Sequence, residues 1–223
     1  TAFIMNRAMQ VSEKTNGSFD ITIYPLMELW GFTTKNYRVP ESSEIAEALK
    51  GVSYTNVSVK GQQVALTGGS SIDLGGIAKG YTSSRVIQIM KDYGIEHAIV
   101  NLGGNVQVLG TKTDGSDWRV AIQNPASENS YLGILSTTDK AVITSGGYER
   151  YFEQDGQVYH HIIDTQTGYP SDSDLTSVTI VYSDGTTADA LSTALFAMGL
   201  DGAKELYRSG DIDFDMIIFD GSR

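Results

Sequence analysis

The chain has 223 residues, of which 40% are hydrophobic and 19% charged, and it carries a formal net charge of −11 at pH 7. This acidic balance argues against a nucleic-acid partner, because a phosphate backbone binds basic surfaces, and no apolar run is long enough to span a membrane. The absence of cysteine excludes disulfides, thiolate metal sites and a cysteine nucleophile.

Helix and strand patterns are mixed along the chain, and the first helix begins almost at residue 1. Because no initiator Met precedes this helix, we expect the chain to lack the N-terminal segment of a longer protein. Helices are expected at 3–14, 42–49, 80–93, 187–198 and 203–209. Strands are expected at 19–24, 57–59, 63–66, 97–102, 106–109, 119–123, 133–136, 140–144, 158–163, 177–182 and 214–219, with an aromatic-rich turn at 25–32. Hairpins outnumber βαβ crossovers, so we expect a single α+β domain over residues 1–223.

The most informative stretch is the glycine turn at 71–81, which contains Asp73, the pair Gly75 and Gly76, and Lys79. Glycines let a ligand approach the backbone closely, and the helix that follows offers free N–H groups and a positive dipole end. Lys79 would add a point charge. This combination is typical of an anion site, although such a turn taken alone is more often structural.

A second candidate site lies on the helix expected at 187–198. Asp189 and Thr193 are four residues apart, so they share one side of the helix and can contact one ion. A carboxylate and a hydroxyl are hard oxygen donors of the kind that Mg²⁺ binds. The alternatives are a solvated surface pair, or an acidic side chain that favours the helix N-terminus.

The third candidate is a histidine pair near a strand end, where His161 precedes Asp164 by three residues. Histidine suits general base catalysis near neutral pH, and a nearby carboxylate can orient it. The alternative is a strand histidine satisfied by a backbone carbonyl. The spacing matches no zinc signature.

Two further loops repeat the pattern of a glycine pair after a strand, at 101–105 and 144–148. Each alone is more often a turn. Together with the glycine turn, and with Trp30 and Phe32 free to stack on a planar ring, they favour a large flat ligand that carries phosphates. The ligand-binding residues expected in these loops are Gly103, Gly104, Asn105, Thr144 and Ser145.

The order of these motifs closely resembles the ApbE family, the FAD:protein FMN transferases, over nearly the whole chain. The motifs that carry the resemblance are Asn16–Asp20, Pro25–Phe32, Asp73–Gly80, Asn101–Asn105, Thr144–Gly146, His161–Gly168 and Ala188–Thr193. The resemblance implies a T-fold-like α+β architecture and the Mg²⁺-dependent transfer of FMN from FAD to a Thr or Ser hydroxyl of a target flavoprotein, with release of AMP. It also implies lipid anchoring at the cell membrane outside the cytoplasm.

By the same resemblance, Asp189, Thr193 and the Gly76 carbonyl would bind Mg²⁺. Ser192, which stands where some members carry a second Asp, is also expected at the metal site. His161 would be the base, steered by Asp164, which Thr165 follows in place of the usual proline. The residues expected to contact FAD are Trp30, Gly31, Phe32, Asp73, Gly75, Gly76, Lys79 and Ile162, besides the loop residues named above.

Two other functions remain open at this stage. A Mg²⁺-dependent FAD pyrophosphatase would use the same residues with water in place of the acceptor hydroxyl. A non-catalytic FAD-binding protein is the second alternative, which the serine at position 192 would favour because it weakens the metal site. Members of the family also carry an earlier strand and flavin contacts before the first helix.

Overall fold

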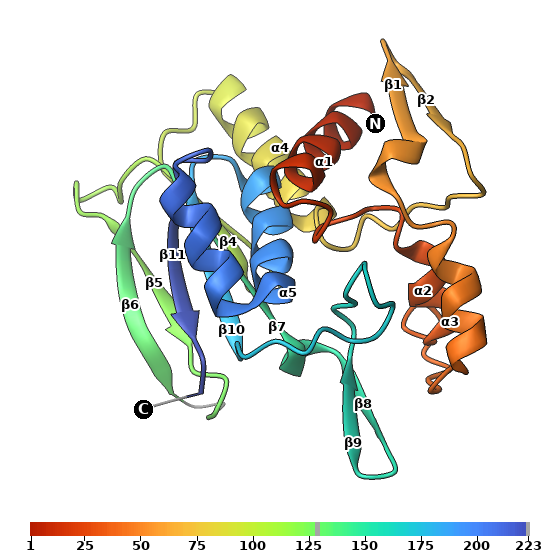
Figure 1. Cartoon of the computed structure of the whole chain (residues 1–223). Coiled ribbons are helices and arrows are strands. Elements are labelled where there is room, and N and C mark those ends of the chain that lie inside the picture. Colours follow the sequence, from red (N-terminus) through yellow and green to blue (C-terminus); the bar gives the residue numbers. More distant parts are fainter. Residues whose placement is uncertain (128–129, 222–223) are drawn as a thin grey trace.

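The computed structural model describes residues 1–127 and 130–221, and Figure 1 shows their arrangement. The helices are α1 (Ala2–Lys14), α2 (Tyr24–Leu29), α3 (Ser42–Leu49), α4 (Ala78–Asp92) and α5 (Gly185–Ser209). The strands are β1 (Val57–Lys60), β2 (Gln63–Leu66), β3 (Ala98–Leu102), β4 (Asn105–Leu109), β5 (Trp118–Gln123), β6 (Tyr131–Thr137), β7 (Ala141–Gly146), β8 (Tyr151–Gln154), β9 (Gln157–His160), β10 (Ser177–Tyr182) and β11 (Asp215–Phe219). This mixture of helices and antiparallel sheets confirms the α+β class.

The central sheet has the strand order β11-β10-β7-β4-β3, and every neighbouring pair is antiparallel. Side chains alternate between its two faces, because successive residues of a strand point to opposite sides. On β7, Ile143 packs in the core beneath α5, whereas Val142 packs on the opposite face against the β5–β6 hairpin. The helices α4 and α5 cover one face, and α1 packs on α5 (Figure 1).

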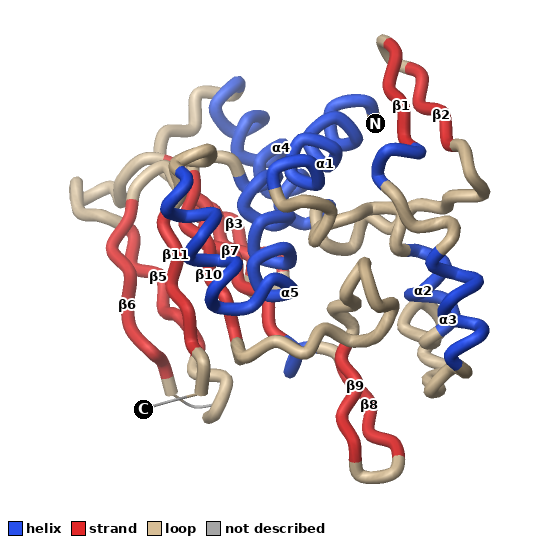
Figure 2. Tube along the Cα trace, in the orientation of Figure 1, coloured by secondary structure: helices blue, strands red, loops and turns tan. Residues whose placement is uncertain are grey.

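Three two-stranded hairpins accompany the central sheet, and Figure 2 shows β1–β2 and β8–β9 extending away from the body of the molecule. A smaller apolar cluster beside the hairpin β8–β9 joins α2 and α3 to the turn that follows α2. Its fully buried centre is Trp30, whose indole N–H donates to the Gly168 carbonyl at 2.9 Å. This cluster holds the turn after α2 against the segment that contains Gly168.

The strand expected at 19–24 is wrong, because the segment forms a turn that leads into α2. The Asp20 carboxylate accepts hydrogen bonds from the backbone N–H groups of Thr22 and Tyr54, and these contacts favour a turn over a strand ladder. Pro25 then occupies the first turn of α2, where its missing N–H costs nothing. Only Ile23 keeps strand-like pairing, through an isolated bridge to Ser71.

The two helices expected at 187–198 and 203–209 form one element, α5, which bends at Gly199. That glycine has φ 71° and ψ −176°, a conformation that favours glycine and interrupts the helical hydrogen bonds. The element begins earlier than expected because Asp184 caps it, accepting from the N–H groups of Thr186 and Thr187. No helix within the described residues is long and apolar enough to cross a bilayer.

Candidate active site

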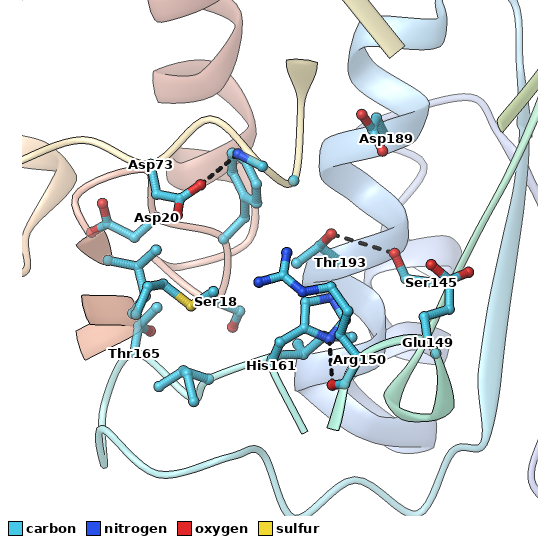
Figure 3. Close-up of a pocket in the computed structure, with 18 of the residues that line it drawn as sticks. Ser18, Asp20, Asp73, Ser145, Glu149, Arg150, His161, Thr165, Asp189 and Thr193 are labelled. Carbon is cyan, nitrogen blue, oxygen red and sulfur yellow. Dashed lines mark hydrogen bonds between the residues drawn. The ribbon is translucent and has the colours of Figure 1, made fainter. Parts of the chain in front are cut away.

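An open cavity of about 980 Å³ lies between the first turn of α4, the middle of α5, the end of β7 and the segment after β9. Figure 3 shows Asp189 and Thr193 of α5, Ser145 of β7 and His161 after β9 around this space. Its lining residues are Ser18, Phe19, Asp20, Ile23, Met27, Asp73, Gly75, Gly76, Lys79, Thr144, Ser145, Gly146, Glu149, Arg150, His161, Ile162, Ile163, Thr165, Asp189 and Thr193. Three of the motifs singled out in the sequence, at 71–81, 144–148 and 187–198, therefore meet with His161 around one space.

Asp189 is the most deeply buried carboxylate of this cavity, with 4% of its surface exposed. Its two oxygens accept hydrogen bonds from the backbone N–H of Gly80 at 2.8 Å and from the Asn105 side-chain amide at 3.0 Å. Burial raises the pKa of Asp189, while these hydrogen bonds and the charge of Lys79 lower it. Burial is the larger effect, so the ionised carboxylate is under-compensated and would be stabilised by a cation.

The first turn of α4 lies directly against this carboxylate, because Gly80 brings the two helices into close contact. A Cβ at position 80 would collide with the Gly185 carbonyl and lie 2.6 Å from the Cβ of Asp189. The positive end of α4 therefore stabilises Asp189, and the Gly80 N–H is not free for a phosphate. The sequence predicted a ligand anion at this helix N-terminus. In the structure the Asp189 carboxylate accepts the hydrogen bond of the Gly80 N–H there.

Thr193 lies one helical turn after Asp189, on the same side of α5. A Cβ built on Gly76 would lie 3.2 Å from the Thr193 hydroxyl, so the Gly76 backbone approaches that oxygen closely. Hard oxygen donors of this type, a carboxylate, a hydroxyl and a backbone carbonyl, fit Mg²⁺. The described residues hold no group of three or more His, Cys, Asp or Glu suited to a metal, so water or substrate oxygens would complete the coordination.

Ser192 does not line the cavity. Its side chain is fully buried, where its hydroxyl donates to the Asp189 carbonyl and lies 2.8 Å from the hydroxyl of Ser145. Ser145 in turn lies 3.4 Å from the Thr193 hydroxyl (Figure 3). The structure therefore places Ser192 behind the expected metal ligands, where it supports Thr193 through Ser145.

His161 lies across the cavity, and its orientation is fixed by the Arg150 carbonyl. That oxygen is 3.0 Å from the backbone nitrogen of His161 and 3.1 Å from its Nδ1. A carbonyl can only accept, so Nδ1 carries the proton and Nε2 keeps its lone pair. Burial, reinforced by the positive charge of Arg150, lowers the pKa of His161 to about 4.

The expectation that Asp164 steers His161 is wrong. The Asp164 carboxylate accepts from the backbone N–H of Gln166 at 2.7 Å and closes a local turn, in which the Gly168 N–H also bonds the Asp164 carbonyl. A backbone carbonyl orients the imidazole instead, which was the alternative left open by the sequence.

The aromatic turn after α2 does not offer free rings to a flavin. Trp30 and Phe32 are 0% and 2% exposed, and both pack in the small cluster with Phe152 of β8. Gly31 between them has φ 81° and lies against the Asn36 backbone, so this turn is a tightly packed support. The Phe32 carbonyl accepts a hydrogen bond from the Arg150 guanidinium at 2.7 Å. Through this bond the turn contacts a residue that lines the cavity.

The glycine pair of the β3–β4 hairpin also lies away from the cavity. Gly103 and Gly104 form its turn with φ of 60° and 93°, values that glycine adopts without strain. Asn105, the next residue, is buried and holds the Asp189 carboxylate through its side-chain amide. In this structure Asn105 positions the Asp189 carboxylate.

The ApbE family model matches residues 1–218 of this chain. The chain belongs to the ApbE family. Proteins named FAD:protein FMN transferase are similar to it: one from Klebsiella pneumoniae strain 342 is 37% identical over 215 residues, covering 92% of this chain and 65% of the relative. A second, from Treponema pallidum strain Nichols, is 34% identical over 222 residues and covers 92% and 61%. The chain thus spans 61–65% of the length of these curated ApbE relatives.

Solved ApbE structures have the same fold. The ApbE protein of Thermotoga maritima superposes with a TM-score of 0.91 at 41% identity, covering 98% of this chain and 72% of that one. The apo flavinyl transferase ApbE of Pseudomonas stutzeri gives a TM-score of 0.84 at 32% identity, with coverages of 97% and 71%. The family resemblance drawn from the sequence motifs is therefore confirmed.

Several lining residues of this cavity were not among the site residues expected from the sequence, although Ser18, Asp20 and Thr165 lie in motifs that carry the family resemblance. Glu149 and Arg150 follow the 144–148 glycine loop directly, and Ser18, Asp20 and Thr165 come from the two turns opposite. Burial raises the pKa of Glu149, and the charge of Lys79 opposes that rise. The sequence signal for Glu149 and Arg150 was a charged pair directly after a candidate loop. Only the fold shows that both side chains line the cavity.

Proposed function

We propose that this chain transfers FMN from FAD to a Thr or Ser hydroxyl of an acceptor flavoprotein in a Mg²⁺-dependent reaction that releases AMP. The names of its curated relatives support the transfer of FMN from FAD to a protein. The observation that carries it is the pairing, in one cavity, of the under-compensated Asp189 carboxylate with a neutral histidine whose Nε2 makes no hydrogen bond to the part of the chain that the structure describes.

The metal would be held by Asp189, Thr193 and the backbone carbonyl of Gly76, which are hard oxygen donors on one wall. When bound there, Mg²⁺ supplies neutralisation of the pyrophosphate charge that otherwise repels an attacking oxygen. Lys79 lines the same wall and would bind a phosphate oxygen as a point charge. These residues orient the two phosphates of FAD for displacement.

His161 would accept the proton of the acceptor hydroxyl at Nε2. The hydroxyl oxygen then forms a bond to the phosphorus of the FMN half, and the bond from that phosphorus to the AMP oxygen breaks. A neutral imidazole is required for this step, and the low pKa of His161 keeps it neutral throughout the physiological pH range. A positioned base of this kind contributes about 10²–10⁴-fold to the rate.

Hydrolysis of FAD to FMN and AMP is the second candidate function. The observation that favours it is the openness of the cavity, because nothing in the described chain excludes water from the space beside His161. Water and the acceptor hydroxyl would use the same base, so the two reactions compete at one site.

The test is incubation of the protein with FAD and Mg²⁺, with and without a Thr-containing acceptor domain, followed by intact-mass analysis and AMP detection. Transfer predicts an acceptor mass gain equal to FMN, equimolar AMP, and loss of both with EDTA. AMP and free FMN without a labelled acceptor would assign the chain to hydrolysis. Intact FAD that stays bound would contradict both reactions and leave a flavin-binding protein.

A further inference from the structure

The hairpin β8–β9 stands beside the cavity as a separate two-stranded sheet. Its two-residue turn, Asp155 and Gly156, has φ of 53° and 77°, the positive values of a tight hairpin turn that closes the pair Gln154 and Gln157. Within the described residues, neither edge of this hairpin pairs with another strand. Figures 1 and 2 show it extending away from the body of the molecule.

The register identifies which backbone groups of the hairpin point outward. The His161 N–H donates to the Arg150 carbonyl, so this opposite pair is hydrogen-bonded and the next such pair is Phe152 with Tyr159. Antiparallel pairs alternate between bonded and non-bonded. The N–H and C=O groups of Tyr151 and Glu153 therefore face the free edge of β8.

The start of β8, at Tyr151, lines a second cavity, whereas the end of β9 contacts the segment that contains Ser171. The second cavity is lined by Phe32, Thr33, Lys35, Tyr37, Glu149, Arg150 and Tyr151, and it shares Glu149 and Arg150 with the first. On the other side, the Nε2 of His160 lies 3.1 Å from the Ser171 carbonyl. The β8 side of the hairpin is therefore connected to the first cavity at Glu149 and Arg150, whereas no residue of β9 lines either cavity.

The hairpin is also held rigidly. Phe152 stacks between Tyr37 at 5.2 Å and Tyr159 at 5.2 Å, and Tyr159 lies 5.5 Å from Trp30. This aromatic row uses one face of the hairpin and leaves Tyr151 and Val158 of the other face 52% and 56% exposed. A fixed strand edge with exposed apolar side chains can bind an extended segment with little ordering cost.

We propose that the free edge of β8 is the docking strand for the acceptor flavoprotein, which adds an extended segment to it and so delivers its hydroxyl past Arg150 to His161. This inference rests on the transferase function proposed above. The second cavity shares Glu149 and Arg150 with the first, so it joins the start of this edge to the cavity that holds the reacting groups. Main-chain hydrogen bonds would supply affinity and the exposed side chains specificity.

The test compares two prolines at cross-strand partners, Glu153→Pro on β8 and Val158→Pro on β9. Each removes one outward N–H, and neither removes a hydrogen bond between the strands, so both are compatible with the hairpin. We expect Glu153→Pro to raise the KM for the acceptor domain about tenfold, the effect of losing one docking hydrogen bond. Val158→Pro should leave that KM unchanged, and both variants should bind FAD as the wild type does.

A second variant removes dependence on the prolines: Thr33→Trp fills the second cavity from its exposed rim and leaves β8 intact. It should also raise the acceptor KM while FAD affinity and the thermal midpoint stay unchanged. Equal effects of the two prolines, or normal acceptor KM in both Glu153→Pro and Thr33→Trp, would overturn the docking assignment. A changed oligomeric mass at normal transfer would assign the edge to self-association instead. Absence of transfer by the wild type contradicts the proposed function, which keeps the two failures distinct.

Discussion

At the scale of single residues, the chemistry of the cavity depends on the protonation states that burial imposes on His161 and Asp189. The Arg150 carbonyl fixes the imidazole tautomer, and burial together with the Arg150 guanidinium keeps the ring neutral. The Asp189 carboxylate is disfavoured in its charged form by the same burial. Protonation of His161 in acid therefore destabilises the folded state, whereas protonation of Asp189 stabilises it.

We expect His161→Gln to make the protein less sensitive to acid. The histidine binds its proton near pH 6.5 when unfolded but near pH 4 when folded, so stability is full above pH 6.5 and declines as pH falls towards 4. The variant lacks this proton uptake. Over that window its free energy of unfolding should therefore fall less than that of the wild type, with a difference on the order of 2 kcal/mol. Urea unfolding at pH 7 and at about pH 4.5 measures the difference. An equal decline in both proteins would contradict the low pKa.

At the scale of elements, the site depends on the close contact of α4 with α5 at Gly80. Any side chain there separates the helices and moves the N–H that holds the Asp189 carboxylate. The local sequence shows only a glycine in the first turn of a helix. The reason for that glycine comes from α5, more than a hundred residues later in the chain.

We expect Gly80→Ala to lower the free energy of unfolding by about 1–3 kcal/mol, because the added methyl group overpacks the helix contact. It should also reduce FMN transfer by displacing Asp189. Gly133→Ala is the control, since no atom of the described residues lies within 4 Å of a Cβ there. Chemical denaturation and a transfer assay on both variants test this. Wild-type stability and activity in Gly80→Ala would show that the helices separate without cost.

Most elements were predictable from local patterns, and the failures have a common cause. Periodicity found α1, α4 and the hairpins β1–β2 and β3–β4, because one apolar face or alternation defines each. It missed the strand β8 and the short helix α2. It failed at 19–24, where the Asp20 carboxylate binds the distant Tyr54 N–H and turns an alternating segment away from any sheet. It also failed for Trp30 and Phe32, whose aromatic rings were read as ligand contacts although they form a core.

At the scale of the whole molecule, metal binding and folding should be linked through Asp189. We expect Mg²⁺ to raise the thermal midpoint at about pH 8, and to do so progressively less as the pH is lowered, because the metal competes with a proton for a carboxylate of raised pKa. The stabilisation should be about 1–3 kcal/mol when Mg²⁺ is roughly 10 to 100 times its Kd. Thermal unfolding with Mg²⁺ or EDTA measures it.

Two carboxylate variants provide the controls for this linkage. Asp189→Asn should abolish the Mg²⁺ effect, whereas Asp211→Asn should retain it, because that exposed carboxylate only approaches Lys14 at 3.9 Å. A pH-independent Mg²⁺ effect that survives in Asp189→Asn would place the cation elsewhere.

The sequence by itself determined the α+β class, most elements and the family, because periodicity, turn residues and motif order are properties of the linear chain. It also identified Asp189, Thr193, His161 and the 71–81 turn as candidates. Only the tertiary structure decided which group orients His161, that the α4 N-terminus faces Asp189, and that Glu149 and Arg150 join two cavities. These are contacts between segments distant in the chain, and no local propensity encodes which distant backbone group a side chain will meet.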